Sequence, residues 1–66
     1  MNLKQLRKGR MMTQQEVADT VGISSVTYSR TELGKIVPLG KTIRLLAELF
    51  DVDALELRDE LQKQEA

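Results

Sequence analysis

Apolar residues recur along this chain at the spacing of amphipathic α-helices. The clearest segment lies past the middle, where apolar residues stand at i, i+3, i+4 and i+7: Ile43, Leu46, Ala47 and Phe50. This spacing places the four side chains on one face and predicts a core-facing helix over residues 41–50. Leu45 and Leu49 widen the stripe, which suits a helix packed on two sides or half-buried at a dimer contact.

Two shorter helices are predicted within residues 13–33, on either side of a glycine. Thr13 followed by Glu16 forms the signature of a capping box, and Gly22 stands where a helix ends in the left-handed conformation. Ser24 is a good N-cap for the next helix, so a turn of only about three residues joins the two. Such a short turn sets the second helix at a steep angle to the first, as in a helix-turn-helix.

Capping residues predict one further helix at each end of the chain. Asn2 can cap a helix over residues 2–9, and Asp53 with Glu56 repeats the capping pattern at the start of a fifth helix. Five helices predict an all-α fold, a compact five-helix bundle that contains a helix-turn-helix. We expect residues 1–66 to form a single domain.

Composition narrows the chemistry that the chain can perform. Its 66 residues include no cysteine and no histidine, which leaves no disulfide, no zinc site, no Cys nucleophile and no His base. We therefore expect no metal, no cofactor, no catalytic residue and no enzyme activity. No segment reads as a signal peptide or approaches the ~20 apolar residues of a membrane span, so we expect a cytoplasmic protein without a membrane partner.

The charges are separated along the chain although the net charge is zero. Residues 1–47 hold eight Lys or Arg against three acids, a net +5, and residues 48–66 hold two against seven, a net −5. A basic half that carries the two-helix motif would orient the domain on a phosphate backbone. The alternative is that these charges are solvated helix faces.

The motif and its surroundings resemble the Cro and lambda-repressor-like (XRE) family of DNA-binding domains over roughly residues 3–57. The matching residues are Gln14, Glu16, Val17, Ala18, Val21, Gly22, Ile23, Ser24, Thr27, Ser29, Arg30, Glu32, Gly34, Lys35 and Pro38, continued by Leu46, Ala47, Val52 and Leu57. The resemblance implies a sequence-specific regulator of transcription that binds double-stranded DNA. Its expected form is a prokaryotic or phage repressor acting as a homodimer on a pseudopalindromic operator.

In this family the second helix of the motif lies in the major groove, which makes its outward residues candidates for reading bases. Arg30 is the leading candidate, because its guanidinium can bond guanine O6 and N7 together; a phosphate contact alone is the other interpretation. Ser25 and Thr27 can bond a base or a phosphate, and Val26 can touch a thymine methyl group.

A second set of residues is expected to contact phosphates. Gln14 stands at the start of a helix, where anions are favoured, and an ordinary solvent-exposed glutamine is its alternative interpretation. The resemblance implies a phosphate contact for Lys35 as well. The full set of phosphate candidates is Arg10, Gln14, Ser29, Lys35, Lys41 and Arg44.

The resemblance also implies two structural contacts. Arg7 is expected to form an ion pair with Glu32 that ties the first helix to the third, against the alternative that Arg7 contacts phosphate. Val52, Ala54 and Leu57 are expected at the dimer contact.

Three positions depart from the family pattern: Thr31, Leu33, which stands where asparagine commonly precedes the glycine, and Gly40, which stands where leucine is frequent. Thr31 replaces a buried aliphatic residue and can bond back to a helix carbonyl, and Gly40 leaves the next helix weakly capped. Residues 36–39 are unusually apolar, and either tuck under the helix that follows or form an exposed patch. The apolar segment and the acidic C-terminal half suggest a second function: an antitoxin-like module that masks a protein partner through residues 33–39 or through the fifth helix.

Overall fold

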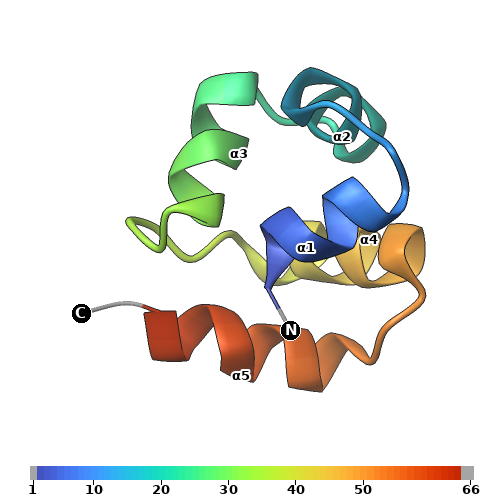
Figure 1. The fold of residues 1–66 in the computed structure, drawn as a ribbon. Coiled ribbons are helices and arrows are strands. Elements are labelled where there is room, and N and C mark those ends of the chain that lie inside the picture. The colour runs from blue at the N-terminus through green and yellow to red at the C-terminus, as the bar shows by residue number, and fades with distance from the viewer. Residues whose placement is uncertain (1, 65–66) are drawn as a thin grey trace.

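The computed structural model describes residues 2–64 and is built from helices alone. They are α1 (Leu3–Gly9), α2 (Gln14–Val21), α3 (Ser25–Glu32), α4 (Gly40–Phe50) and α5 (Ala54–Gln64). In Figure 1, α2 and α3 lie above, α5 runs along the base, and α1 and α4 lie between them. The all-α fold class is confirmed. Residues 1 and 65–66 of the expected domain lie outside the described range.

The turn between α2 and α3 has the predicted local structure. Thr13 and Glu16 form both hydrogen bonds of the capping box at the start of α2. Gly22 ends that helix with φ 77°, a left-handed conformation that glycine adopts without steric cost. The Ser24 hydroxyl then accepts from the Thr27 amide and starts α3. The orientation of α3 is therefore fixed by local capping as well as by packing.

The other helix starts differ in how well they are capped. The side chain of Asn2 accepts from the Gln5 amide at the start of α1. Asp53 caps α5 by accepting from the amides of the second and third residues that follow it. At α4 the N-cap is Leu39 and no side chain bonds the free amides, as the glycine at position 40 predicts.

All five helices contribute buried apolar side chains to one core. Its fully buried members include Ala18 from α2, Tyr28 from α3 and Leu46 from α4, each 0% exposed. Thr31 is also 0% exposed, and its hydroxyl donates to the Thr27 carbonyl at 2.9 Å, as predicted. The polar residue in this position is therefore satisfied without a partner from another helix.

One expected dimer residue belongs to this core. Leu57 is 1% exposed and packs inward from α5, so its side chain offers no surface to a second subunit and that assignment is corrected. Val52 and Ala54 are half-buried and do reach the surface. Their neighbour Leu55 is 62% exposed.

Candidate nucleic-acid interface

Helix α3 presents a continuous face to solvent. Val26 is 57% exposed and Arg30 is exposed, whereas Ser25, Thr27 and Ser29 are half-buried. All the predicted base-reading residues therefore reach the surface of one helix. Because Tyr28 anchors the opposite face in the core, α3 presents these side chains from a rigid support.

Thr27 is the most constrained of the base-reading candidates. Its hydroxyl oxygen accepts from the Ser24 hydroxyl at 2.9 Å, and its amide donates to the same Ser24 oxygen. The side chain is therefore held in one orientation at the N-terminal end of α3, and part of its bonding capacity is already used.

A buried ion pair fastens α3 to the beginning of the chain. Nε of Arg7 lies 2.6 Å from Oε2 of Glu32, and the two side chains keep only 12% and 5% of their surface exposed. Arg7 also donates to the Met12 carbonyl at 3.0 Å. The guanidinium thus joins α1, the α1–α2 link and the C-terminal turn of α3, and its remaining capacity for a phosphate is small.

Gln14 completes this cluster. Its Nε2 donates to Oε1 of Glu32 at 3.2 Å, which adds the first residue of α2 to the network. A side-chain amide nitrogen carries two hydrogens, so one remains for a second acceptor. Glu32 therefore orients the group that the sequence predicts to contact phosphate.

The cluster changes the acidity of its members. Burial alone would raise the pKa of Glu32, but the polar groups around the carboxylate, above all the hydrogen-bonded and charged Arg7, outweigh it and hold that pKa below its ordinary value. Burial raises the pKa of Tyr28, and the nearby Glu32 carboxylate acts in the same direction. The Tyr28 hydroxyl is buried and has no hydrogen-bond partner within residues 2–64.

The lowered pKa of Glu32 predicts an acid-sensitive fold. The ionised carboxylate stabilises the folded state above its unfolded pKa near 4.5, and this contribution is lost as pH falls through the lower folded value. We expect the melting temperature of the wild type to approach that of Glu32→Gln as pH falls below about 4.5. Thermal melts of both proteins between neutral and acid pH measure the gap; a constant gap would contradict the assignment.

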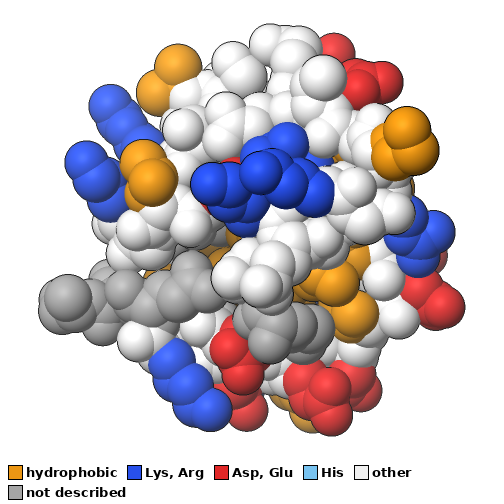
Figure 2. All heavy atoms as spheres, viewed as in Figure 1, with side chains coloured by type: hydrophobic (Ala, Val, Ile, Leu, Met, Phe, Trp, Pro, Cys, Tyr) orange, Lys and Arg blue, Asp and Glu red, His pale blue; other side chains and the backbone are white. Residues whose placement is uncertain are grey.

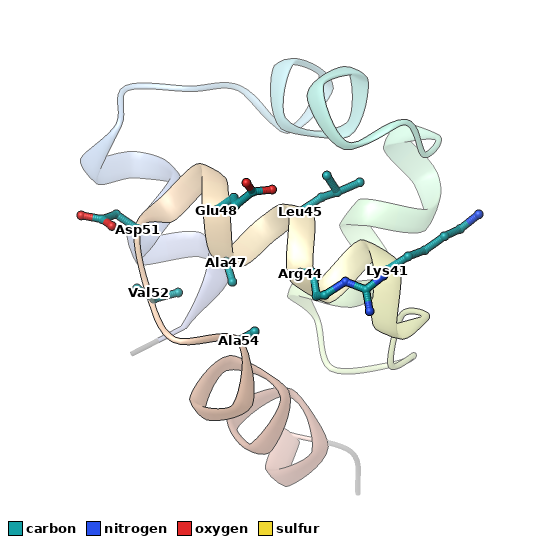
Figure 3. A pocket seen from close by; sticks show the side chains of 8 residues that line it. All are labelled: Lys41, Arg44, Leu45, Ala47, Glu48, Asp51, Val52 and Ala54. Atoms are coloured by element: carbon teal, nitrogen blue, oxygen red, sulfur yellow. The ribbon is translucent and has the colours of Figure 1, made fainter.

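Basic residues surround the candidate interface unevenly. Arg10 and Lys35 are exposed in the segments that follow α1 and α3, respectively. Figure 2 shows blue side chains around α1 and α3 and the largest group of red side chains along α5. Lys41 and Arg44 lie instead on α4, where they line a groove together with two acids (Figure 3). The phosphate candidates are thus not one surface, and these two stand apart.

The apolar segment after α3 is divided between core and surface. Ile36, Val37 and Pro38 are half-buried, and Val37 packs against the core. Leu39 at its end is 70% exposed, and Leu33, the C-cap of α3 that precedes the segment, is 67% exposed. Both expectations for this segment therefore hold in part.

Sequence reasoning missed two features of the site. The bond from Gln14 to Glu32 joins positions 18 residues apart and leaves no local signal. The exposure of Leu55 did have a local sequence signal, because Ala54, Leu57 and Leu61 share a helical face to which Leu55 does not belong. Among the described residues no cluster of side chains is placed to hold a metal ion. No helix in that range has the length and apolar character needed to cross a membrane.

Comparison with known proteins places these features in a family. A family model described as helix-turn-helix matches residues 3–57. An "Uncharacterized HTH-type transcriptional regulator YqaE" of Bacillus subtilis (strain 168) is 41% identical over 51 residues, which cover 77% of this chain and 44% of that protein. The chain thus spans less than half the length of this relative. No solved structure matches.

Proposed function

The chain belongs to the XRE-type helix-turn-helix family, and from this premise we propose that it binds double-stranded DNA as a sequence-specific regulator of transcription. The observation that carries the proposal is the outward face of α3. A short helix held by a capped turn and a buried tyrosine presents Val26 and Arg30 to solvent, which is the form of a helix that enters the major groove.

The proposed reading of bases depends on the chemistry of this face. Arg30 bonds guanine O6 and N7 through its two-pronged guanidinium, and Val26 touches a thymine methyl group. Ser25 and Thr27 bond bases or phosphates near the N-terminus of α3, and Ser29 bonds a phosphate. Direct contacts from so short a helix cover only a few base pairs.

A single small domain therefore needs a second copy to reach useful affinity. We propose that two copies bind a pseudopalindromic operator with half-sites about 34 Å apart. A dimer bound at a promoter in a prokaryotic cell, or in a host infected by phage, would exclude polymerase and so act as a repressor. Val52 and Ala54 remain candidates for the contact between the copies.

The proposed phosphate contacts lie at the edges of α2 and α3. Gln14 offers a phosphate the amide hydrogen that Glu32 leaves free, at a helix N-terminus that already favours anions. Lys35 reaches the backbone from the segment after α3, and Arg10 from the α1–α2 link. These contacts set position and orientation and carry no sequence information.

Replacing the phosphate contacts should weaken binding equally on every sequence. Gln14→Ala and Lys35→Ala should each lower the affinity for any duplex, and Lys35→Ala should also reduce the slope of log affinity against log salt by about 1. Anisotropy titrations of specific and scrambled duplexes at several salt concentrations measure both effects. Lys63→Ala, an exposed lysine on α5, is the matched control. A salt slope unchanged by Lys35→Ala would remove that residue from the interface.

The exposed leucines beside α3 support a second candidate function. Leu33 and Leu39 stand 67% and 70% exposed at the two ends of the segment 33–39, which fits a module that masks a protein partner. That module would form a stable complex with another protein and bind DNA weakly without sequence preference. If the chain is a partner-masking module, the double variant Leu33→Ser and Leu39→Ser should no longer form the complex with the other protein. If the chain is a DNA-binding regulator, the same variant should still bind DNA.

A further inference from the structure

The outward face of α4 carries charges whose sign reverses halfway along it. Lys41 and Arg44 lie on the N-terminal half, and Glu48 and Asp51 lie on the C-terminal half and the cap that follows. All four are exposed. The charges are spaced symmetrically along the chain. Position 46 lies midway between Lys41 and Asp51, and also midway between Arg44 and Glu48. Leu45, 43% exposed, stands among them.

A groove of about 730 Å³ follows this face where α4 meets the start of α5. The four charged residues line it together with Ala47, Val52 and Ala54 (Figure 3). A second hollow of about 260 Å³ shares Arg44 and Ala54 with the groove and extends to the exposed Leu55. The surface thus has small apolar residues between a basic and an acidic end.

The charges on this face form no ion pair within residues 2–64. Arg44 and Glu48 are four positions apart, but arginine on the N-terminal side is the weaker order for such a pair. Figure 3 shows that their charged ends do not meet. The two ion pairs recorded for residues 2–64 are Arg7–Glu32 and Arg58–Asp59, and neither involves this face.

We propose that this face binds a second copy of the chain, with the two α4 helices antiparallel about a two-fold axis that crosses the interface midway between Arg44 and Glu48. A two-fold axis reverses the direction of the partner helix and brings the basic half of one copy against the acidic half of the other. In this register Arg44 lies opposite Glu48 of the other copy.

The charge order selects this occupant over others. A purely acidic partner, including a DNA backbone, would be repelled by Glu48 and Asp51, and a purely basic one by Lys41 and Arg44. A surface with the same charges in reversed order is complementary along its whole length, and a second copy supplies that surface. One helix pair buries little area, so the dimer is weak and transient in the absence of DNA.

This inference deepens the homodimer of the proposed function and rests on it. It assigns Arg44 to the contact between copies instead of to a phosphate. It also replaces the buried Leu57 by Arg44, Leu45 and Glu48 as the residues that hold the dimer together.

The test is the association state of the full chain without DNA. Sedimentation equilibrium at concentrations up to about 1 mM compares the wild type with Arg44→Glu, Glu48→Arg and the double variant. Each single reversal places like charges opposite each other and should weaken the dimer at least about tenfold. The double variant restores opposite charges and should recover it. Lys4→Glu, an equal charge change on α1, should have no effect.

Three results would overturn the inference: a wild type that stays monomeric throughout this range, single variants that still dimerise, or a double variant that fails to recover. Circular dichroism confirms that each variant is folded, and the neutral pair Arg44→Gln and Glu48→Gln repeats the test without reversed charges. A wild type that stays monomeric but still selects one DNA sequence would refute this interface and leave the proposed DNA-binding function standing. Loss of sequence selection in the wild type would instead remove the proposed function.

Discussion

Replacing Glu32 by alanine should unfold the protein at a markedly lower temperature. The substitution leaves the guanidinium of Arg7 buried without its carboxylate and also removes the acceptor of Gln14. Breaking a buried pair costs about 3–5 kcal/mol, and we expect about 3 because Arg7 keeps 12% of its side-chain surface exposed. In a domain of this size the melting temperature should fall by roughly 12 to 24 °C.

The second ion pair of the chain supplies the control. Arg58 and Asp59 keep 50% and 61% of their side-chain surface exposed, so Asp59→Ala should cost less than about 1 kcal/mol. A cycle that adds Arg7→Ala to Glu32→Ala isolates the coupling between the two residues. Additive effects in that cycle would mean that the pair does not hold α1 to α3.

Replacing Arg30 by alanine should relax base preference at one position of each half-site. A bidentate contact from arginine to guanine contributes about 1–3 kcal/mol of discrimination, so affinity for the specific duplex should fall about 5- to 150-fold. Affinity for a scrambled duplex should change far less, by the loss of one charge. Competition titrations with duplexes substituted at each position would locate the base that Arg30 reads.

Two control variants separate the roles open to Arg30. Arg30→Lys keeps the charge but loses the two-pronged geometry, so it should also lose discrimination. Arg58→Ala removes an exposed arginine on α5 and should leave base preference unchanged. An equal loss of affinity on all sequences for Arg30→Ala would make this residue a phosphate contact.

Local rules predicted the helices and their caps, because these depend on residues three or four positions apart. Thr13 and Glu16 form the capping box within one turn, and Gly22 has the left-handed φ that the sequence signals. The apolar stripe on α4 is equally local. Ile43 and Leu46 both face the core because residues three positions apart lie on the same side of a helix. Recognition of the fold class needed little more than this.

Contacts between distant residues could not be read from spacing. Arg7 and Glu32 are 25 positions apart, and their pairing was suggested by the resemblance to a family instead of by any periodicity. The assignment of Leu57 to the dimer contact was wrong. An apolar helical face has the same sequence pattern whether it packs on the core of its own chain or on a second subunit. Only the packing of α5 beneath α4 separates the two, and it places Leu57 inside.

The segment after α3 shows a third limit. Its apolar residues have no helical or strand period, so the sequence does not tell which of them face the core. The structure buries Val37 and exposes Leu33 and Leu39, and this leaves both candidate functions with a surface.

The central claim is that α3 reads DNA sequence as part of a two-fold assembly, and selection from a pool of random duplexes tests it most directly. We expect enrichment of a two-fold symmetric motif with half-site centres about one helical turn, or a multiple of it, apart. The selected duplex should bind at least about 10³-fold more tightly than its scramble at physiological salt. No enrichment, with weak and steeply salt-dependent binding to every duplex, would contradict the claim and favour the partner-masking module.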